Sequence, residues 1–475
     1  MFELGSLICG AAPTSVALII GRAIAGIGVG GIFSGAMVIL AYSRKFQFPI
    51  YPCRMTQTCF SSTSEAPDRV WVPRRHVGNR FSCGTPTRRR FHRSCVLAMV
   101  FLHQVCCSHN HDVVCFYSFS YSLPIGAFSI AVIVFVLHIP RQSDHTGKSL
   151  RERLGELDLI GASIFIPAII CLLLALQWGG SKYDWSNSRI IGLFVGFAAL
   201  IAIFIYWQFR LGDKATIPPR ILTQRTVAAS SGYAVMFAAG FFLLLFYLPI
   251  YFQSIKGVSA TKSGIEVVPL LLSTVLSSII AGGLISTVGY YTPFLIASSV
   301  IFSIGTGLLS TYKVNTPFGR WFGFQVLTGA GVGAGFQVPL IAVQTVLPLE
   351  DIPVGTAVVI FFQTLGGALF ISIGQNVFQN GVIRGTREFV PQLDPKILID
   401  TGATEIRTAL ENAGKLDLLP QALQAYMVGL TDALRVAVAT ACFTFVASLF
   451  MEWRSVKDDE AKRKKEAAAE LGLAV

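Results

Sequence analysis

Charged residues are scarce in this chain. Only 13% of its 475 residues are Asp, Glu, Lys or Arg, whereas 53% are hydrophobic. A soluble domain carries about 25% charged residues. The composition therefore excludes a soluble metal-binding or nucleic-acid-binding protein and predicts an integral membrane protein.

Signatures of bound cofactors are also missing. The chain has no G-x-x-x-x-G-K-[ST] loop, so no nucleotide site is expected. Its densest group of possible metal ligands fits no standard zinc spacing: Cys106, Cys107, His109, His111 and Cys115. We therefore predict no enzymatic activity, no cofactor and no resident metal.

Long apolar runs are what the chain does have. A helix needs about 20 apolar residues to cross a bilayer. Residues 2–12 resemble the end of one such span, and because the chain opens inside it without a signal peptide, Met1 is not expected to be the natural start. The other predicted spans are 17–42, 123–140, 157–178, 190–209, 228–251, 264–287, 292–311, 322–347, 353–378 and 429–451.

The distribution of Lys and Arg predicts the orientation of these spans. Connections 141–156 and 208–226 carry four each, and the tail from Arg454 to Lys465 carries six, whereas the alternate short connections carry two each. Basic connections stay on the cytoplasmic side, so these three segments are predicted to be cytoplasmic. The longer 379–428 connection is predicted on the far side, as a capping helix or a plain connector.

Residues 44–122 differ from the rest. They hold seven of the ten cysteines and five of the seven histidines, and most of the net charge of +12. A metal site, a nucleic-acid patch at Arg88–Arg90 and Arg93, and a disordered insert are alternatives. We favour translation in the wrong frame, because codons for Gly78 to Arg90, read one base later, can give GIASVVGPPLGG. Retained introns at 105–122 and 44–63 are part of this hypothesis.

Arg22 is the most informative single residue. It is the one charge in residues 12–40, which also contain Gly26 and Gly28. A cation at membrane depth costs at least about 2.5 kcal/mol and usually has a function, and glycines let a second helix approach closely. Arg22 therefore suggests a moving, ion-coupled membrane protein.

Several sequence blocks in order carry a family resemblance. They are FELGSLICGAA, GRAIAGIGVGGIFSGA, LPIGAFSIAVIVF, LLLALQWGGSKYDWSNSRIIGL, FYLPIYFQSIKGVSATKSGIEVVPL, GAGVGAGFQVPLIAVQ and MEWRSVK. The chain resembles the 14-span drug:proton antiporter branch of the major facilitator superfamily, close to fungal toxin and multidrug efflux pumps. The resemblance covers residues 1–43 and 123–457.

The resemblance implies roles for individual residues. The family's fourth-span pattern matches Leu18, Arg22, Gly26 and Gly28, with Ala25 where glutamine is common, and implies that Arg22 takes part in proton coupling. The alternative is an arginine bonded to carbonyls of neighbouring helices. Family spans one and two and their gating loop are missing, and the span-five antiporter motif exists only in the shifted frame.

Other polar and aromatic residues at membrane depth are candidates from their position. Glu266 is either an interfacial residue or a proton carrier. Glutamines 337, 344 and 363 either bind substrate in a central cavity or join helices by hydrogen bonds. Phe241 is a further cavity candidate, and so is Tyr247, which has the alternative of an interfacial aromatic.

The predicted architecture is an incomplete all-α major facilitator fold with about ten legible spans. Residues 1–141 are assigned to the N-terminal half, 157–209 to two inserted linker spans, 228–451 to the C-terminal six-helix half and 452–475 to a cytoplasmic tail. The resemblance implies a monomer in the plasma or vacuolar membrane that exports small amphipathic compounds against protons by alternating access. The alternatives are an importer of a siderophore-like compound and a truncated or mis-spliced product that does not transport.

Overall fold

The computed structural model describes residues 2–10, 14, 16–17, 20–31, 158–180, 183–348, 350–400, 406–412 and 414–457. Within these ranges the regular structure is helical, apart from two isolated bridges, as an all-α fold requires. The predicted frame-shifted segment 44–122 and the predicted span 123–140 lie outside the described residues. The chain divides into two compact units, Met1–Gly28 with Ile50–Ile139, and Val29–Pro49 with Pro140–Val475.

The described part of the first unit is a close helix pair. Helix α1 (Phe2–Gly10) packs against the helix Ile20–Gly31. A Cβ atom built at Gly5 would lie 2.2 Å from the backbone nitrogen of Ala25, and one built at Gly28 would lie 2.2 Å from that of Phe2. The two backbones touch because these positions lack side chains.

The second unit contains eight described helices that are long and apolar enough to cross a membrane. They are α6 (Leu159–Trp178), α7 (Ser188–Leu211), α9 (Arg225–Ser254), α10 (Ala260–Val288), α11 (Thr292–Leu309), the pair α12 (Phe318–Gly335) and α13 (Val338–Val346), α14 (Ile352–Phe389) and α17 (Leu419–Leu449). The short elements between them are η1 (Gly212–Lys214), α8 (Pro219–Leu222), α15 (Pro395–Asp400), α16 (Ile406–Asn412) and η2 (Leu416–Leu418).

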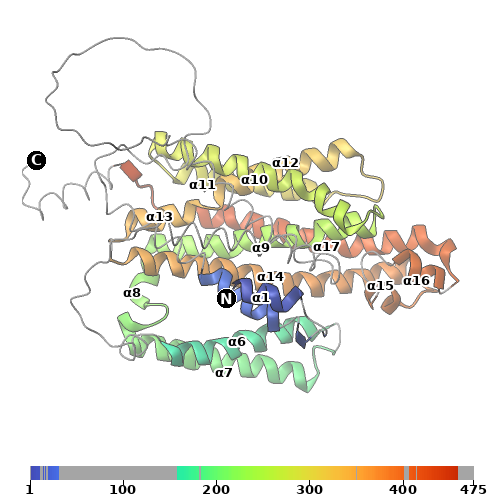
Figure 1. Cartoon of the computed structure of the whole chain (residues 1–475), viewed down its shortest axis with the longest axis horizontal. Helices are drawn as coiled ribbons and strands as arrows, with labels where there is room; N and C mark the ends of the chain where they lie inside the picture. The colour runs from blue at the N-terminus through green and yellow to red at the C-terminus, as the bar shows by residue number, and fades with distance from the viewer. Residues whose placement is uncertain are drawn as a thin grey trace, which may run out of the picture. The chain divides into compact units, whose positions relative to one another are not determined.

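Helix α9 is the centre of this unit. In its most apolar stretch 72% of residues are buried, compared with 11% in α7. Helices α14 and α17 pack along it. Helix α17 also packs against α11, and α11 and α12 lie on the side of the bundle away from α14 (Figure 1). Helices α6 and α7 pair with each other and contact the rest mainly through α14. The α6–α7 pair is therefore peripheral, and most of its apolar surface is left for lipid.

The Asp158 carboxylate ties the start of α6 to the end of α7. It caps α6 by accepting the Gly161 N–H, at 2.7 Å. It also accepts hydrogen bonds from three residues at the end of α7 and just beyond it, Trp207, Gln208 and Thr216. Burial alone would raise the pKa of Asp158, but these hydrogen bonds outweigh burial and lower the pKa to about 2.

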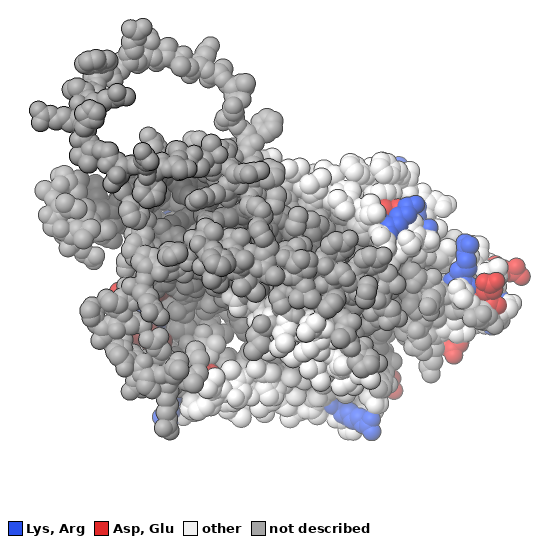
Figure 2. Space-filling model, in the orientation of Figure 1, with Lys and Arg blue, Asp and Glu red and all other residues white. Residues whose placement is uncertain are grey.

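Two further contacts fix the end of the unit that is predicted to face the cytoplasm. Arg220 binds Asp351, the N-cap residue of α14, through both terminal nitrogens, at 3.0 and 2.8 Å. The residues after α17 turn back onto the α10–α11 turn, where the Val456 N–H donates to the Gly289 carbonyl at 2.7 Å. On the face drawn in Figure 2, the visible charged side chains lie towards the helix ends, with uncharged surface between them.

The structure corrects three predicted boundaries. The span predicted at 322–347 is interrupted between α12 and α13. Helix α14 runs 11 residues past the predicted end at 378, and α17 begins at Leu419 rather than at 429. The 379–428 segment is therefore largely helical, with α15, α16 and η2 between the ends of the two long helices (Figure 1).

We expect Asp158→Asn to lower the thermal stability of the protein in detergent. The amide would present N–H groups to donors, and losing hydrogen bonds to a charged acceptor costs about 1.5–3 kcal/mol. Because the pKa of Asp158 is lowered from 3.8 to about 2, its stabilisation is present above about pH 4 and is lost as the pH falls from 4 to 2. Melting temperatures measured across this range would test both points.

Asp184→Asn, in the exposed α6–α7 connection, is the matched control. Equal melting curves for the two variants would contradict the assigned role of Asp158.

Candidate functional site

The interruption between α12 and α13 is the most unusual feature of the membrane-depth backbone. Phe336 and Gln337 separate the two helices, and Pro339 follows in the first turn of α13. The nine residues of α13 extend about 14 Å, so the break lies roughly halfway through a hydrocarbon layer of about 30 Å. Phe336 and Gln337 keep right-handed helical dihedral angles, so the break is a local loss of helix hydrogen bonds ahead of Pro339. Broken helices often form binding sites in transporters.

Glycines on α12 hold the helix before the break against its neighbours. A Cβ atom at Gly329 would lie 2.3 Å from the Leu270 carbonyl oxygen, and one at Gly333 would lie 2.1 Å from that of Thr274, both in α10. On the other side, a Cβ atom at Gly331 would lie 2.5 Å from the Phe302 nitrogen in α11. Helix α12 therefore fits between α10 and α11 because these positions lack side chains.

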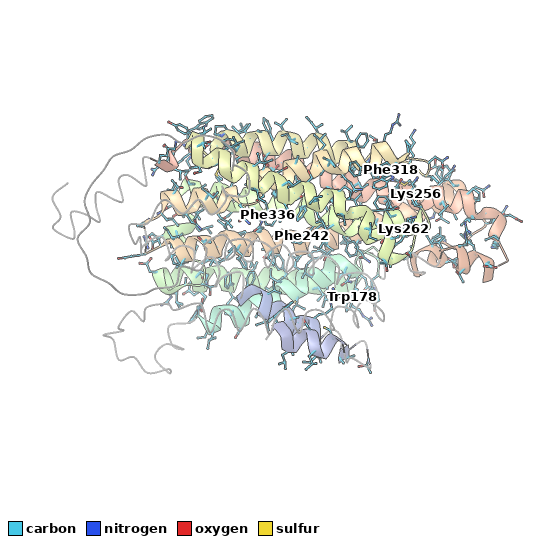
Figure 3. All side chains as sticks on the ribbon, turned by 45° about the horizontal axis from the view of Figure 1, so that its top comes forward. Trp178, Phe242, Lys256, Lys262, Phe318 and Phe336 are labelled. Atoms are coloured by element: carbon cyan, nitrogen blue, oxygen red, sulfur yellow. The ribbon has the colours of Figure 1, made fainter. Side chains whose placement is uncertain are left out.

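Aromatic rings from α9 surround the break. The Phe336 ring centre lies 5.7 Å from that of Phe241 and 6.2 Å from that of Phe237. Phe237 also stacks on Tyr233, at 5.2 Å. Phe242, labelled with Phe336 in Figure 3, has its ring centre 5.8 Å from that of Phe241. The surroundings of the break are therefore apolar and aromatic.

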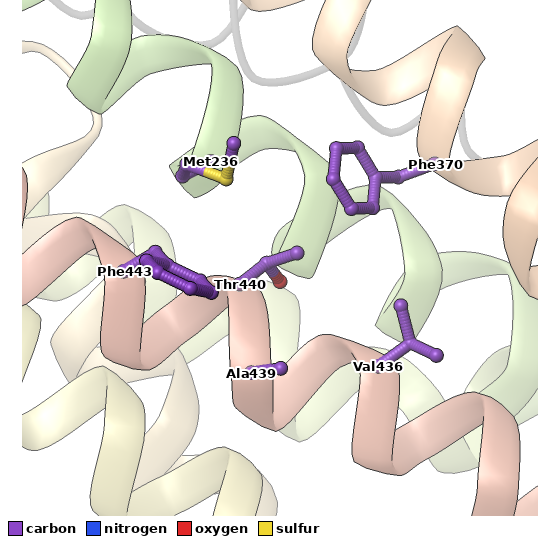
Figure 4. Close-up of a pocket in the computed structure, with 6 residues that line it drawn as sticks. All are labelled: Met236, Phe370, Val436, Ala439, Thr440 and Phe443. Carbon is purple, nitrogen blue, oxygen red and sulfur yellow. The ribbon is translucent and has the colours of Figure 1, made fainter.

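A small hollow lies nearby between α9, α14 and α17. Its volume is about 160 Å³ (Figure 4), and its lining residues are Met236, Phe370, Val436, Ala439, Thr440 and Phe443. Thr440 donates its hydroxyl to the Ala437 carbonyl of its own helix, so the lining is effectively apolar. Drug-sized ligands occupy about 300–1,000 Å³, so this hollow could hold only part of such a molecule.

Glu266 belongs to a charged group at the other end of the unit, predicted to face away from the cytoplasm. Its backbone carbonyl accepts a hydrogen bond from the fully buried Gln325, at 3.0 Å. The charges of Lys256 and Lys262, both labelled in Figure 3, act on the half-buried carboxylate of Glu266. Burial lowers the pKa of Lys256, and the Glu266 carboxylate opposes that change.

Comparison with curated proteins gives the family. The chain is 44% identical over 462 residues to the MFS-type efflux pump MFS1 of Arthroderma benhamiae and to that of Trichophyton rubrum, covering 96% of this chain and 78% of each relative. It is 38% identical over 461 residues to the efflux pump aflT of Aspergillus parasiticus, covering 97% and 82%. The chain belongs to the major facilitator superfamily. No family model matches it.

This relationship and the eight candidate spans make the protein a multi-pass membrane transporter of the efflux-pump type. It acts on small molecules within a membrane. The family and fold that the sequence blocks predicted are thereby confirmed.

The transporter's predicted cavity residues are distributed over α9, the break, α13 and α14. Gln337 lies at the break, and Phe241 is fully buried one ring away from it. Gln344 and Gln363 are buried in α13 and α14, 6% and 8% exposed. None of the five predicted cavity residues lines the 160 Å³ hollow.

Tyr247 occupies a different environment from an interfacial aromatic. It is 1% exposed, its ring centre lies 5.6 Å from that of Phe378, and within the described residues its hydroxyl has no hydrogen-bond partner. The interfacial alternative for Tyr247 is therefore wrong. Its part in a substrate cavity stays a prediction.

Arg22 is exposed on the helix Ile20–Gly31 in the first unit. The two motif glycines after it differ: Gly28 is buried against Phe2, whereas no described atom lies within 4 Å of a Cβ built at Gly26. Only Gly28 therefore supports a close helix approach here. The coupling role of Arg22 stays a prediction.

Sequence reasoning did not identify the residues of the hollow. Met236, Phe370 and Phe443 are ordinary apolar residues on three helices far apart in sequence. The break had one local signal, Pro339, which cannot donate a backbone hydrogen bond and often ends a helix before it.

We expect Gly333→Ala to destabilise the transporter and lower its efflux activity. The added methyl group meets the Thr274 carbonyl, and overpacking of this kind costs about 1–3 kcal/mol. Gly323→Ala on the same helix is the matched control, because no described atom lies within 4 Å of its Cβ position and alanine favours a helix by about 1 kcal/mol.

Melting temperatures and efflux rates of the two purified variants would test this. A Gly333→Ala protein as stable as the Gly323→Ala protein would contradict the close packing of α10 and α12.

Proposed function

We propose that this efflux transporter exchanges protons for small amphipathic compounds by alternating access, acting as a monomer. In this proposal residues 1–141 and 228–451 form the two halves that rock about the substrate, and 157–209 form the inserted linker pair. The observation that carries the proposal is a carboxylate within a candidate span, Glu266, held among positive charges.

Glu266 has the surroundings that a proton carrier needs. A carboxylate changes its proton affinity when its distance from cations or water changes. Lys256 is anchored on two carbonyls of the α11–α12 connection, Val314 and Thr316, both at 2.9 Å. Any movement of that connection relative to α10 would change the field on Glu266, which links protonation to conformation.

Arg22 has a different task in the proposal. It supplies a fixed positive charge in its half of the transporter. A bound proton or an acidic partner would then respond to that charge as the helix moves.

The substrate would bind beside the broken span. The aromatic rings around Phe336 offer apolar and π contacts, and Gln337 adds an amide that can donate and accept. A mainly apolar site with a small number of polar groups favours amphipathic compounds over highly charged ones. The neighbouring hollow of about 160 Å³ would accept an apolar substituent.

A proton-gradient transport assay tests this proposal. The full chain is reconstituted in vesicles, and ethidium, an amphipathic fluorescent cation, is the probe. We expect an imposed pH gradient to drive ethidium movement, a protonophore to abolish it, and Glu266→Gln to reduce it by roughly tenfold or more, as for loss of a proton-transfer group.

Glu388→Gln is the matched control, because Glu388 is exposed near the end of α14 on the same predicted side. Ethidium movement that is insensitive to the protonophore would exclude proton coupling. Full gradient-driven transport by Glu266→Gln would exclude Glu266 as the carrier.

A further inference from the structure

A second hollow lies at the end of the bundle that is predicted to face the cytoplasm. Its volume is about 330 Å³, and it lies between the start of α9, the end of α13 and the residues after α17. Unlike the apolar hollow of Figure 4, it is lined mainly by polar and charged residues: Gln224, Arg225, Thr226, Val346, Glu452 and Arg454. Apart from Val346, the last residue of α13, none of these residues belongs to the broken span, and none belongs to the group around Glu266.

The start of α9 contributes unsatisfied donors to this hollow. Gln224, the N-cap residue, makes no side-chain cap hydrogen bond, so the first N–H groups of this 30-residue helix lack that usual acceptor. The positive end of the helix dipole lies at the same place and favours an anion.

Thr226 is an independent indication of a ligand. It lines the hollow, is only 1% exposed, and its hydroxyl has no hydrogen-bond partner within the described part of the chain. An unsatisfied buried hydroxyl is costly. An oxygen atom of a bound anion would accept this hydrogen and remove the cost.

Two guanidinium groups border the same space. Arg225 donates from Nε to the Phe450 carbonyl, at 3.2 Å, at the end of α17. Arg454 pairs through Nε with Glu452, also at 3.2 Å. In the described residues both contacts engage Nε, which leaves the terminal nitrogens of the two groups for an anion.

The chain holds Arg454 in place before any ligand arrives. The Val456 N–H donates to the Gly289 carbonyl, and the Thr292 hydroxyl donates to the Glu452 carbonyl at 3.0 Å. Lys457 also bonds to the Thr287 carbonyl. These contacts fix the backbone on both sides of Arg454, which lowers the entropy lost on binding.

We propose that this hollow binds a phosphate group at the cytoplasmic end of the transporter. Two arginines against one glutamate leave a net positive charge, and a guanidinium matches phosphate oxygens in bidentate geometry. The volume accommodates a phosphorylated headgroup. The phosphate comes either from a membrane lipid or from a soluble anion.

Binding measurements on the full chain in phosphatidylcholine nanodiscs test the proposal. The probes are dioctanoyl phosphatidylinositol 4-phosphate and inorganic phosphate, titrated separately and in competition. We expect saturable binding of at least one probe, and Arg454→Gln to weaken it by about tenfold, as for loss of a charged hydrogen bond. Arg210→Gln, an exposed arginine at the end of α7 on the same predicted side, should leave binding unchanged.

Thr226→Val separates a binding role from a structural one. Removing an unpartnered hydroxyl should raise the melting temperature of the anion-free protein while weakening phosphate binding. Binding of the lipid that inorganic phosphate cannot displace would assign the site to a headgroup, and effective competition would assign it to a soluble anion. The proposal is overturned if neither probe binds, or if Arg210→Gln weakens binding as much as Arg454→Gln.

Discussion

The hydrocarbon layer offers no hydrogen-bond partners, so a chain that crosses it must satisfy its own backbone. Each described candidate span does so by forming a helix, and buried hydroxyls such as Thr274, Thr306 and Thr386 bond to carbonyls one turn back in their own helix. Against this background the interruption at Phe336 and Gln337 is exceptional. The glycines that draw α12 onto its neighbours and the α9 rings that contact Phe336 give the break protein neighbours.

The same constraint divides the second unit into closely packed central spans and a less closely packed peripheral pair of helices. Water does not drive helices together inside a bilayer, so close contact depends on small residues and polar links. The six spans formed by α9, α10, α11, α12 with α13, α14 and α17 have such contacts at many glycines. The α6–α7 pair has few. Its described links include the bonds that Asp158 accepts from the end of α7, the bond from Asn376 to the Gly179 carbonyl, and the contact of the Phe165 ring with Phe361 of α14.

Hydropathy predicted the eight described spans because each contains a long apolar run, and family resemblance supplied the fold. Hydropathy did not predict the ends of α14 and α17, where the helices continue into polar sequence, because a helix outside the bilayer carries no hydropathy signal. Asp432 pairs with Arg435, three residues later on the same helix, and also with Arg384, 48 residues earlier, which no local spacing indicates. Gln337 could be selected as a polar residue at depth, whereas the hollow beside Phe370 depends on how three distant helices meet.

The length of helix α14 has a consequence for how far its ends can move. Its 38 residues extend about 57 Å, nearly twice the thickness of a hydrocarbon layer of about 30 Å. Arg220 holds the start of α14 through its bond to Asp351, and α15 packs against α14. If α14 pivoted at the Arg220–Asp351 contact, a tilt of about 5° would displace its far end by about 5 Å. A small rotation of α14 at one membrane surface would therefore displace its far end, beyond the other surface, by a larger distance.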